Sequence, residues 1–430
     1  MNEQTAGAPT PQHGPNPRAM LLAMALAIGL GTLVQLVPAL KPAAEWTIEH
    51  IASPIGQLFL RSLFMLVVPL LFSGLVVGIA ELDLRRLGRI GARTLFYTVL
   101  ASTVSVVIGL LLVNIVQPGV GASGDLKAAL AGVQVPAAAK APEVSTPLGL
   151  LVAMVPDNPV RAAANGEMLP LIVFALLFGI ALSLTPSDGA LRLRDAIQGL
   201  FDVSMTLIHL VLRIAPFGIG ALIFALTARL GVDLLGLLAA YVAVVLSALA
   251  LHMFGFYSLT IALLARRSPL AFFRGVRVAM LTAFSTASSN ATLPTALQVA
   301  EEELKLPKHV ARFVLTAGAA MNQNGTALFE GVTVLFLAQV FGVQLGIGQQ
   351  AIVMLICILA GIGTAGVPAG SLPVIAMMLG MVNVPVEGLG LILGVDRFLD
   401  MCRTTVNVTG DLAAAVYVAR GEEPQPALNS

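Results

Sequence analysis

The chain has 430 residues, of which 57% are hydrophobic and only 11% are charged. Soluble domains have roughly 45–50% apolar and about 25% charged residues, so this composition excludes a soluble fold and predicts an all-α polytopic membrane protein. A formal net charge of +1 without a basic face excludes nucleic acid as a partner. The two cysteines, Cys357 and Cys402, lie in separate apolar segments and predict neither a disulfide framework nor a metal site.

Apolar segments follow a polar, proline-rich stretch at 1–17, which we expect to be a disordered cytoplasmic tail. They cover 19–40, 55–81, 94–117, 146–155 with 169–184, 196–228, 233–265, 278–300, 310–341, 350–382 and 385–418. A span needs about 20 residues, so the length allows about eight spans. A Gly-, Ala- and Pro-rich insertion occupies 118–145, and a second short tail occupies 419–430.

Arginine clusters predict the orientation in the membrane. They follow the second, fourth and sixth apolar segments, at Arg85, Arg86, Arg89, Arg93, Arg192, Arg194, Arg266, Arg267, Arg274 and Arg277. Because cytoplasmic loops are enriched in Lys and Arg, these clusters place both termini in the cytoplasm and 118–145 outside. The chain is therefore expected in a cell inner or plasma membrane.

Three of the last four apolar segments are interrupted by polar or glycine-rich runs. These are FSTASSNATLPT (284–295), MNQNGT (321–326) and GIGTAGVPAGSLP (361–373). Such runs free backbone groups that hydrocarbon cannot satisfy, so they are tolerated only where they line a cavity. Two broken hairpins beside a broken helix and a polar helix suggest inverted repeats, 268–341 and 346–418, with a solute held between them.

The last segment carries a stripe of charged and amide side chains. In DRFLDMCRTTVNVTGD, the helical period places six polar side chains on one face: Asp396, Asp400, Arg403, Thr404, Asn407 and Asp411. Charges at membrane depth normally face a protein interior or a solute pathway, so this helix is predicted to hold a charged solute and cations. The alternative is an internal salt bridge between Asp400 and Arg403 that only ties helices together.

The SSNATLPT, NQNGTALFE, GTAGVP and DMCRTTVNVTGD runs occur in this order. Together they resemble the glutamate/aspartate transporter family, the dicarboxylate/amino acid:cation symporters, over nearly the whole chain. The resemblance implies eight transmembrane helices, two re-entrant hairpins, a homotrimer in the lipid bilayer and an elevator mechanism. It implies a scaffold at 18–82 and 146–229, and a mobile transport domain at 83–117 and 230–418.

The resemblance also assigns substrate contacts. Asp400 would bind the substrate ammonium and Arg403 its side-chain carboxylate, roles that suit an anion and a planar two-pronged donor. Because the chain has both Asp400 and Arg403, the resemblance favours an acidic amino acid as the substrate. The other implied substrate contacts lie on the same helix, on the broken helix and at the two hairpin tips: Thr404, Asn407, Thr326, Ser288, Ser289, Asn290, Val367, Pro368, Ala369 and Gly370. We expect the helix after the first tip to start near Thr292 and Pro294, with its N–H groups toward an α-carboxylate.

Coupling cations are where this chain departs from the family pattern. The first sodium site is retained as Gly318, Asn322, Asn407 and Asp411, whose oxygens suit a hard cation. A second site of backbone carbonyls matches Ala320, Gly361, Ile362 and Thr364. The third sodium site of the family lacks its carboxylate here, because the usual NMDGT motif reads NQNGT, with Gln323 and Asn324. Its other matching positions are Thr98, Ala101 and Ser102, of which only the serine is retained. We expect this third sodium to be absent.

Glu330 lies eight residues after Asn322 on the broken helix. The resemblance links a glutamate there to proton coupling, and burial favours the protonated form of a carboxyl group. The alternative is a protonated Glu330 fixed to a backbone carbonyl that never titrates. The sequence thus predicts a proton-coupled importer of L-glutamate or L-aspartate, with or without sodium, that needs no cofactor and is not an enzyme. The alternatives are a sodium-coupled carrier of C4-dicarboxylates or neutral amino acids, and a substrate-gated anion conductance.

Overall fold

The computed structural model describes residues 17–80, 88–120, 152, 155–165, 167–230, 233–363, 371–420 and 422. The described part of the chain is helical and contains no strand. The elements of its first half are α1 (Pro17–Leu36), η1 (Pro38–Leu40), α2 (Lys41–Thr47), η2 (Ile48–Ala52), α3 (Ser53–Phe64), α4 (Val67–Ala80), α5 (Gly88–Val116), α8 (Pro159–Asn165), α9 (Met168–Leu184) and α10 (Asp188–Leu230). The chain bends by 110° between α1 and the segment from Pro38 to Phe59.

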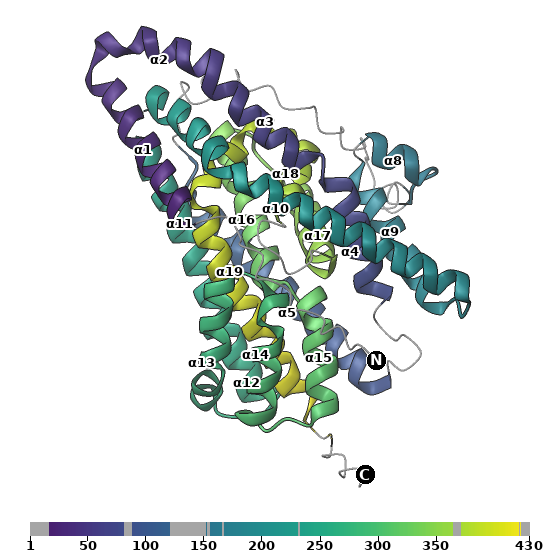
Figure 1. Cartoon of the computed structure of the whole chain (residues 1–430). Coiled ribbons are helices and arrows are strands. Elements are labelled where there is room, and N and C mark those ends of the chain that lie inside the picture. Colours follow the sequence, from purple (N-terminus) through teal and green to yellow (C-terminus); the bar gives the residue numbers. More distant parts are fainter. Residues whose placement is uncertain are drawn as a thin grey trace, which may run out of the picture.

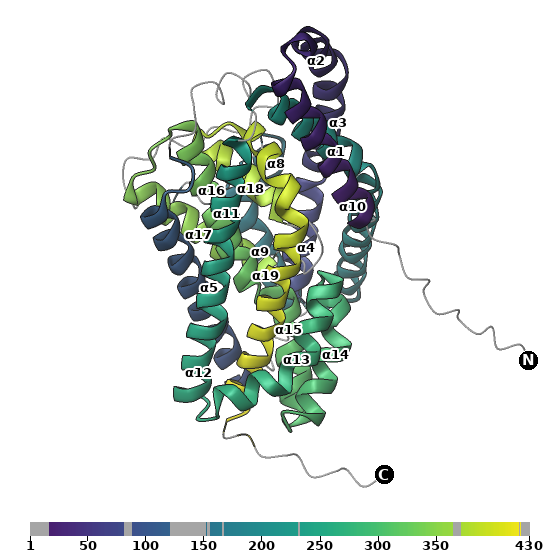
Figure 2. The same cartoon turned by 90° about the vertical axis from the view of Figure 1, so that its left-hand side faces the viewer.

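The second half supplies the elements that carry the predicted site. They are α11 (Asp233–Ala250), the π-helical η3 (Leu251–Tyr257), α12 (Ser258–Leu263), α13 (Pro269–Thr286), α14 (Ser289–Glu302), α15 (Lys308–Met321), α16 (Asn324–Phe341), α17 (Ile347–Gly363), α18 (Ser371–Met381), η4 (Val386–Gly388) and α19 (Leu389–Val418). In Figures 1 and 2, α19 runs through the bundle among α11, α13, α15 and α16, and these helices pack against it. The prediction that Asp396 to Asp411 lie on a single helix is confirmed, since α19 runs from Leu389 to Val418.

The predicted helix breaks at 284–295 and 321–326 are confirmed, but the start of the helix after the first break was predicted wrongly. α14 begins at Ser289 rather than near Thr292 and Pro294, because Ser288 is its N-cap and accepts a hydrogen bond from the backbone N–H of Ala291 (3.2 Å). A serine N-cap satisfies one of the free N–H groups of the first turn. Ala287 makes the preceding turn with φ 50°. The third break, 361–373, falls largely outside the described residues.

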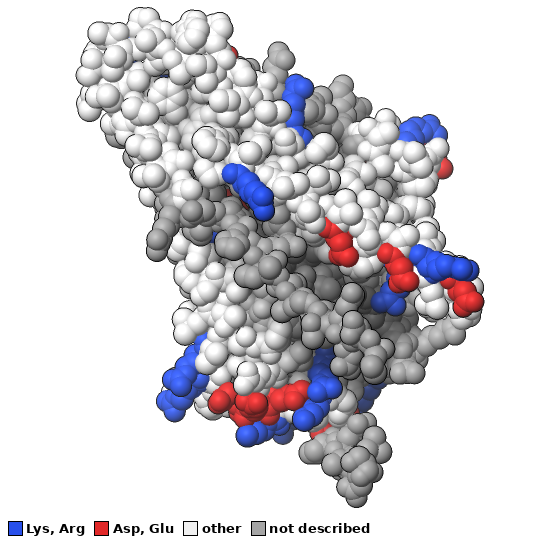
Figure 3. All heavy atoms as spheres, viewed as in Figure 1, with Lys and Arg blue, Asp and Glu red and all other residues white. Residues whose placement is uncertain are grey.

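α16 is the centre of the core: every residue from Asn324 to Ala338 is buried. Three described helices are long and apolar enough to cross a membrane, namely Arg89–Val116, Gly236–Leu263 and Lys308–Phe341, and counting each of two bent pairs as one span gives five. Eight spans therefore stay a prediction. In Figure 3, charged side chains of both signs gather at the end of the molecule where α12 to α15 meet, and others lie scattered over the rest of this mostly uncharged face. Glu301 there forms ion pairs with Lys308 (3.9 Å) and Arg312 (3.4 Å).

Candidate functional site

The charged stripe of α19 forms a compact cluster in the interior. The Arg403 guanidinium donates to Asp400 (Nε to Oδ1, 3.0 Å) and to Asp396 (Nη1 to Oδ1, 3.1 Å), and all three side chains are buried. Its Cζ lies 4.2 Å from the centre of the Phe329 ring, which belongs to α16. Charge-assisted bonds and the ring face together compensate a cation that has left water. The ion pair does exist, but both of its members lie on α19, so it does not tie helices together.

Arg397 is a fourth charged residue of this cluster, and sequence reasoning did not include it among the candidate site residues. Its Nη1 lies 3.7 Å from Asp400 Oδ2, the carboxylate oxygen that Arg403 does not contact. One position after Asp396, Arg397 sits beside the stripe rather than on it, which is why the helical period gave no reason to select it. A signal was available, since arginine inside an apolar segment is rare without a function.

Asn407 lies at the break between α15 and α16 and supplies a cap that the local sequence lacks. Its Oδ1 accepts hydrogen bonds from the backbone N–H groups of Gly325 (2.7 Å) and Thr326 (3.4 Å), the second and third residues of α16. Gln323, the N-cap residue of α16, makes no side-chain capping bond. Free N–H groups at a helix start require acceptors. Asn407 provides one from another helix.

Gln323 and Thr326 complete the environment of the Asn407 amide. Asn407 Nδ2 donates to Gln323 Oε1 (2.5 Å) and to Thr326 Oγ1 (3.0 Å), while Gln323 Nε2 donates to the Ala319 carbonyl (2.9 Å). The residues that make these bonds are all buried, and Ala320, which follows Ala319, is half-buried. The structure thus brings the predicted substrate residues Thr326 and Asn407 together, and Thr404 is buried on the same helix.

Asp411 and Asn322 meet as the first predicted cation site requires. Asn322 Nδ2 donates to Asp411 Oδ1 (2.8 Å), and Asn322 Oδ1 is buried without a hydrogen-bond partner among the described residues. Gly318 permits this approach, because a Cβ there would lie 2.5 Å from Asp411 Oδ1. A buried carboxylate beside an unpaired amide oxygen is a donor set that suits a hard cation. The residues present therefore fit a sodium ion.

Hydrogen bonds among uncharged side chains occupy the position where we expect the third sodium site of the resembling family to be absent. Asn324 Oδ1 accepts from Ser102 Oγ (2.8 Å), and Asn324 Nδ2 donates to the Tyr257 hydroxyl (3.2 Å). Tyr257 in turn donates to the Val406 carbonyl (3.2 Å) of α19, and Ser105 donates to the Asn324 carbonyl (2.9 Å). Sequence reasoning had not identified Tyr257 or Ser105. Both the oxygen and the nitrogen of the Asn324 amide thus have hydrogen-bond partners in the protein.

Parts of the second cation site and of the hairpin tips fall outside the described residues. These parts are Thr364 and the second-tip residues Val367, Pro368, Ala369 and Gly370. Gly361 lies near the helix break, since a Cβ there would be 3.6 Å from the Gln323 carbonyl oxygen. Ile362 is in the last turn of α17. At the first tip, Asn290 is exposed and Ser289 is buried with no described partner for its hydroxyl.

Glu330 is completely buried on α16, next in sequence to the Phe329 that stacks on Arg403. Neither of its carboxyl oxygens has a hydrogen-bond partner among the described residues. The hydrogen bond to a backbone carbonyl that the alternative for Glu330 requires is therefore not found among the described residues. Burying an ionised carboxylate without a partner costs several kcal/mol, so this environment fits a neutral, protonated side chain.

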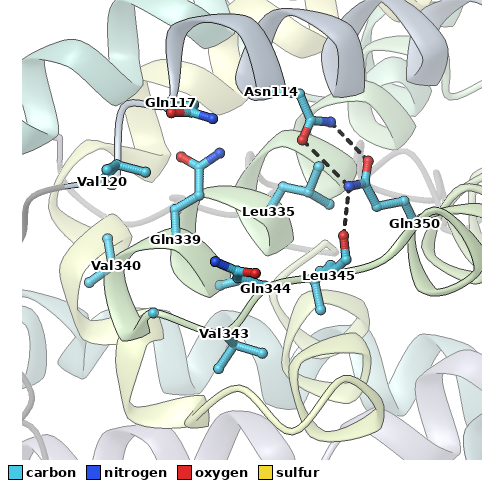
Figure 4. Close-up of a pocket in the computed structure, with 12 residues that line it drawn as sticks. Asn114, Gln117, Val120, Leu335, Gln339, Val340, Val343, Gln344, Leu345 and Gln350 are labelled. Carbon is cyan, nitrogen blue, oxygen red and sulfur yellow. Dashed lines mark hydrogen bonds between the residues drawn. The ribbon is translucent and has the colours of Figure 1, made fainter.

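A pocket of about 500 Å³ lies elsewhere, where α5 and α16 end (Figure 4). Its polar lining consists of amides, including Asn114, Gln339 and Gln350, and Asn114 Nδ2 donates to Gln350 Oε1 (2.8 Å). None of the lining residues is charged, and none is a predicted site residue. A charged solute requires charged or closely converging partners. The stripe of α19, and not this pocket, is therefore the candidate site.

Gly325 of α16 lies against the backbone of α19, which gives a test of their packing. A Cβ at this position would lie 2.6 Å from the Arg403 carbonyl oxygen and 3.1 Å from Asn407 Oδ1. We expect Gly325→Ala to lower the free energy of unfolding by about 1–3 kcal/mol, because the backbone of α19 must shift. Thermal unfolding in detergent measures this. Gly199→Ala on α10 is the control, since no atom lies within 4 Å of its Cβ position. Equal stability of the two variants would contradict the close packing.

Comparison with known proteins agrees with this arrangement. The family model of the sodium:dicarboxylate symporter family matches residues 18–421. The chain is 35% identical to a proton/glutamate-aspartate symporter of Escherichia coli, over 94% of this chain and 92% of the relative. It is 33% identical to a proton/sodium-glutamate symport protein of Bacillus caldotenax (86% and 87% covered) and 32% identical to a C4-dicarboxylate transport protein of Azorhizobium caulinodans (86% and 82%). The chain with its buried stripe of charges on α19 therefore belongs to the sodium:dicarboxylate symporter family.

Proposed function

We propose that this protein is a secondary active symporter that imports L-glutamate or L-aspartate together with protons, with or without sodium. The observation that carries the proposal is the buried cluster of Asp396, Asp400 and Arg403 on α19, where charges of both signs stand in an otherwise apolar bundle. Intramembrane charges mark solute pathways. Relatives named as proton/glutamate-aspartate and proton/sodium-glutamate symporters support the same substrates and ions.

The chemistry of the site supports an amino acid with two carboxylates. Arg403 matches a carboxylate in charge and shape, and Asp400 offers an anion to an ammonium. A C4-dicarboxylate carrier, which the Azorhizobium caulinodans relative is named for, has no ammonium to bind. In such a carrier, Asp400→Ala would leave substrate binding unchanged. Loss of binding in this variant favours the amino acid.

Two positions are proposed for the coupling ions. Asp411 with Asn322 and Gly318 would hold a sodium ion, whose binding neutralises the buried carboxylate. Glu330 would carry the proton, because it is buried without a hydrogen-bond partner among the described residues and lies next to the residue that stacks on Arg403. The uncharged network around Asn324 favours a symporter without a third sodium.

The architecture that accompanies this function is also a proposal. It comprises eight spans, two re-entrant hairpins formed by α13–α14 and α17–α18, a homotrimeric scaffold at 18–82 and 146–229, and a transport domain at 83–117 and 230–418 that moves as an elevator. Both termini would lie in the cytoplasm. The charged side chains gathered where α12 to α15 meet (Figure 3) support the cytoplasmic assignment of that end, since positive charge is enriched there.

Uptake into proteoliposomes under separate ion gradients tests the proposed function. We expect labelled aspartate or glutamate to accumulate when only a pH gradient is imposed, and we expect Glu330→Gln to abolish that accumulation because an amide cannot release a proton. Exchange of labelled for unlabelled aspartate at equal pH should persist in this variant. Glu303→Gln, which changes an exposed glutamate, is the matched control. Strict sodium dependence that is indifferent to pH and to Glu330→Gln would overturn proton coupling.

A further inference from the structure

The guanidinium of Arg397 is placed for a ligand that the described residues do not provide. Its Nε and Nη1 atoms are buried, and neither has a hydrogen-bond partner among the described residues. The side chain as a whole is 20% exposed, and the nearest acidic group, Asp400 Oδ2, is at 3.7 Å, too far for a hydrogen bond. Buried donors without acceptors are costly, and those of a charged group most of all. An anion that reached these atoms would remove that cost.

Arg397 also lies at the edge of the open face of its helix. The next residue, Phe398, is 46% exposed, and Met401 and Cys402 are half-buried, whereas Asp396 and Asp400 on the other side of Arg397 are buried. One turn of helix brings residues three and four apart together, so Arg397 is a neighbour of both the half-buried Met401 and the buried Asp400. The Arg397 side chain therefore lies at the border between the exposed and the buried faces of α19.

Asp400 shows what kind of group fits between the two arginines. Its Oδ1 accepts from Arg403 Nε (3.0 Å), and its Oδ2 faces Arg397 Nη1 (3.7 Å), so one carboxylate already sits between two guanidinium groups. Among these four residues the charges balance, with two carboxylates and two guanidiniums. When Asp400 pairs with a substrate ammonium, it no longer compensates the charges of the two guanidinium groups, which then require another anion.

We propose that Arg397 is a second carboxylate-binding residue of the substrate site, which holds the side-chain carboxylate of the substrate together with Arg403. Asp400 occupies the place of that carboxylate in the structure and gives it up when it pairs with the substrate ammonium. This role rests on the proposed function, since it requires a substrate with an ammonium group and a second carboxylate. Arg397 would then determine specificity for acidic over neutral amino acids, because only an acidic side chain supplies a carboxylate that can pair with both guanidinium groups.

The test compares aspartate with asparagine, which has an uncharged carboxamide in place of the side-chain carboxylate. Affinities of the purified protein for both are measured by competition against labelled aspartate, in wild type, Arg397→Gln and Arg397→Lys. We expect Arg397→Gln to weaken aspartate binding by at least about tenfold, the effect of losing one charge-assisted contact, and to change asparagine binding less than about threefold. Arg397→Lys should restore part of the aspartate affinity, because it keeps the charge without the planar group.

Equal losses for aspartate and asparagine, or no loss for either, would overturn the proposal. If Arg397→Gln fails to fold, Arg397→Met preserves the apolar packing of the stem and makes the same prediction. The proposed function fails separately, when wild type itself neither binds nor accumulates acidic amino acids. The role of Arg397 fails when wild type prefers aspartate to asparagine and the variants keep the same preference.

Discussion

Arg403→Gln is expected to abolish uptake of aspartate and glutamate. The guanidinium is the hydrogen-bonded partner of both Asp396 and Asp400, so its removal leaves two buried carboxylates close together without their shared partner. Removing one partner of a buried ion pair costs about 3–5 kcal/mol. We therefore expect a large loss of affinity for acidic amino acids and a lower thermal stability, measured by labelled uptake and by thermal unfolding in detergent.

Two comparisons separate recognition from folding in this experiment. Arg403→Lys keeps the positive charge but cannot reach both carboxylates with a planar group, so we expect it to recover stability more than substrate affinity. A labelled neutral amino acid, measured by direct binding, should bind folded Arg403→Gln and wild type about equally well, since it presents no side-chain carboxylate. Uptake of aspartate by Arg403→Gln within about threefold of wild type, a difference below 1 kcal/mol, would refute the assigned role.

Asp411→Asn is expected to remove sodium dependence while leaving the local structure intact. Asparagine keeps an oxygen that can accept the hydrogen bond from Asn322 Nδ2, so only the negative charge is lost. Losing the carboxylate of a buried cation site costs several kcal/mol, which corresponds to an affinity for sodium that is lower by roughly 100-fold or more. The measurement is aspartate uptake as a function of sodium concentration at a fixed pH on both sides.

Uptake driven by a pH gradient alone should be retained in Asp411→Asn, and its loss in Glu330→Gln provides the complementary result. Asp202→Asn, on α10, is a control that changes an aspartate far from this cluster in sequence. If Asp411→Asn responds to sodium as wild type does, sodium does not bind at Asp411. If wild type shows no response to sodium at all, this site has another ligand and protons alone drive uptake.

Hydropathy and polar interruptions were sufficient to predict the helices that carry the site. Gly325 with the amides around it marked the break between α15 and α16, and the single polar stripe marked α19 as one helix. The start of α14 was misplaced because Pro294 is a good first residue of a helix, whereas the structure uses the hydroxyl of Ser288 and tolerates the proline inside the helix. Local propensity is overridden where a better cap precedes it.

Spacing and periodicity alone could not predict contacts between distant segments, and the meeting of Asn322 with Asp411 was expected only from the family resemblance. Residue spacing placed Asp396, Asp400 and Arg403 on one face, and the structure pairs them. No periodicity shows that Tyr257 meets Asn324, because they lie on different helices and 67 positions apart. Arg397 was missed for a different reason. It follows Asp396 directly in the sequence, but its side chain leaves the helix about 100° away from that of Asp396 and so lies beside the polar stripe.

The cap that Asn407 donates to α16 has a consequence for coupling. α16 carries Glu330, and α19 carries Asp400, Arg403 and Asp411, so the proposed proton site and most of the proposed solute site lie on different helices. The two helices are linked at the start of α16, where the N–H groups of Gly325 and Thr326 donate to Asn407 Oδ1 of α19. An N-cap is worth about 1 kcal/mol, and any displacement of α19 that withdraws Asn407 forfeits it. By thermodynamic reciprocity, a solute or ion that stabilises this cap from one helix would favour occupancy of the proposed site on the other, so Asn407 is one contact that would couple the two sites.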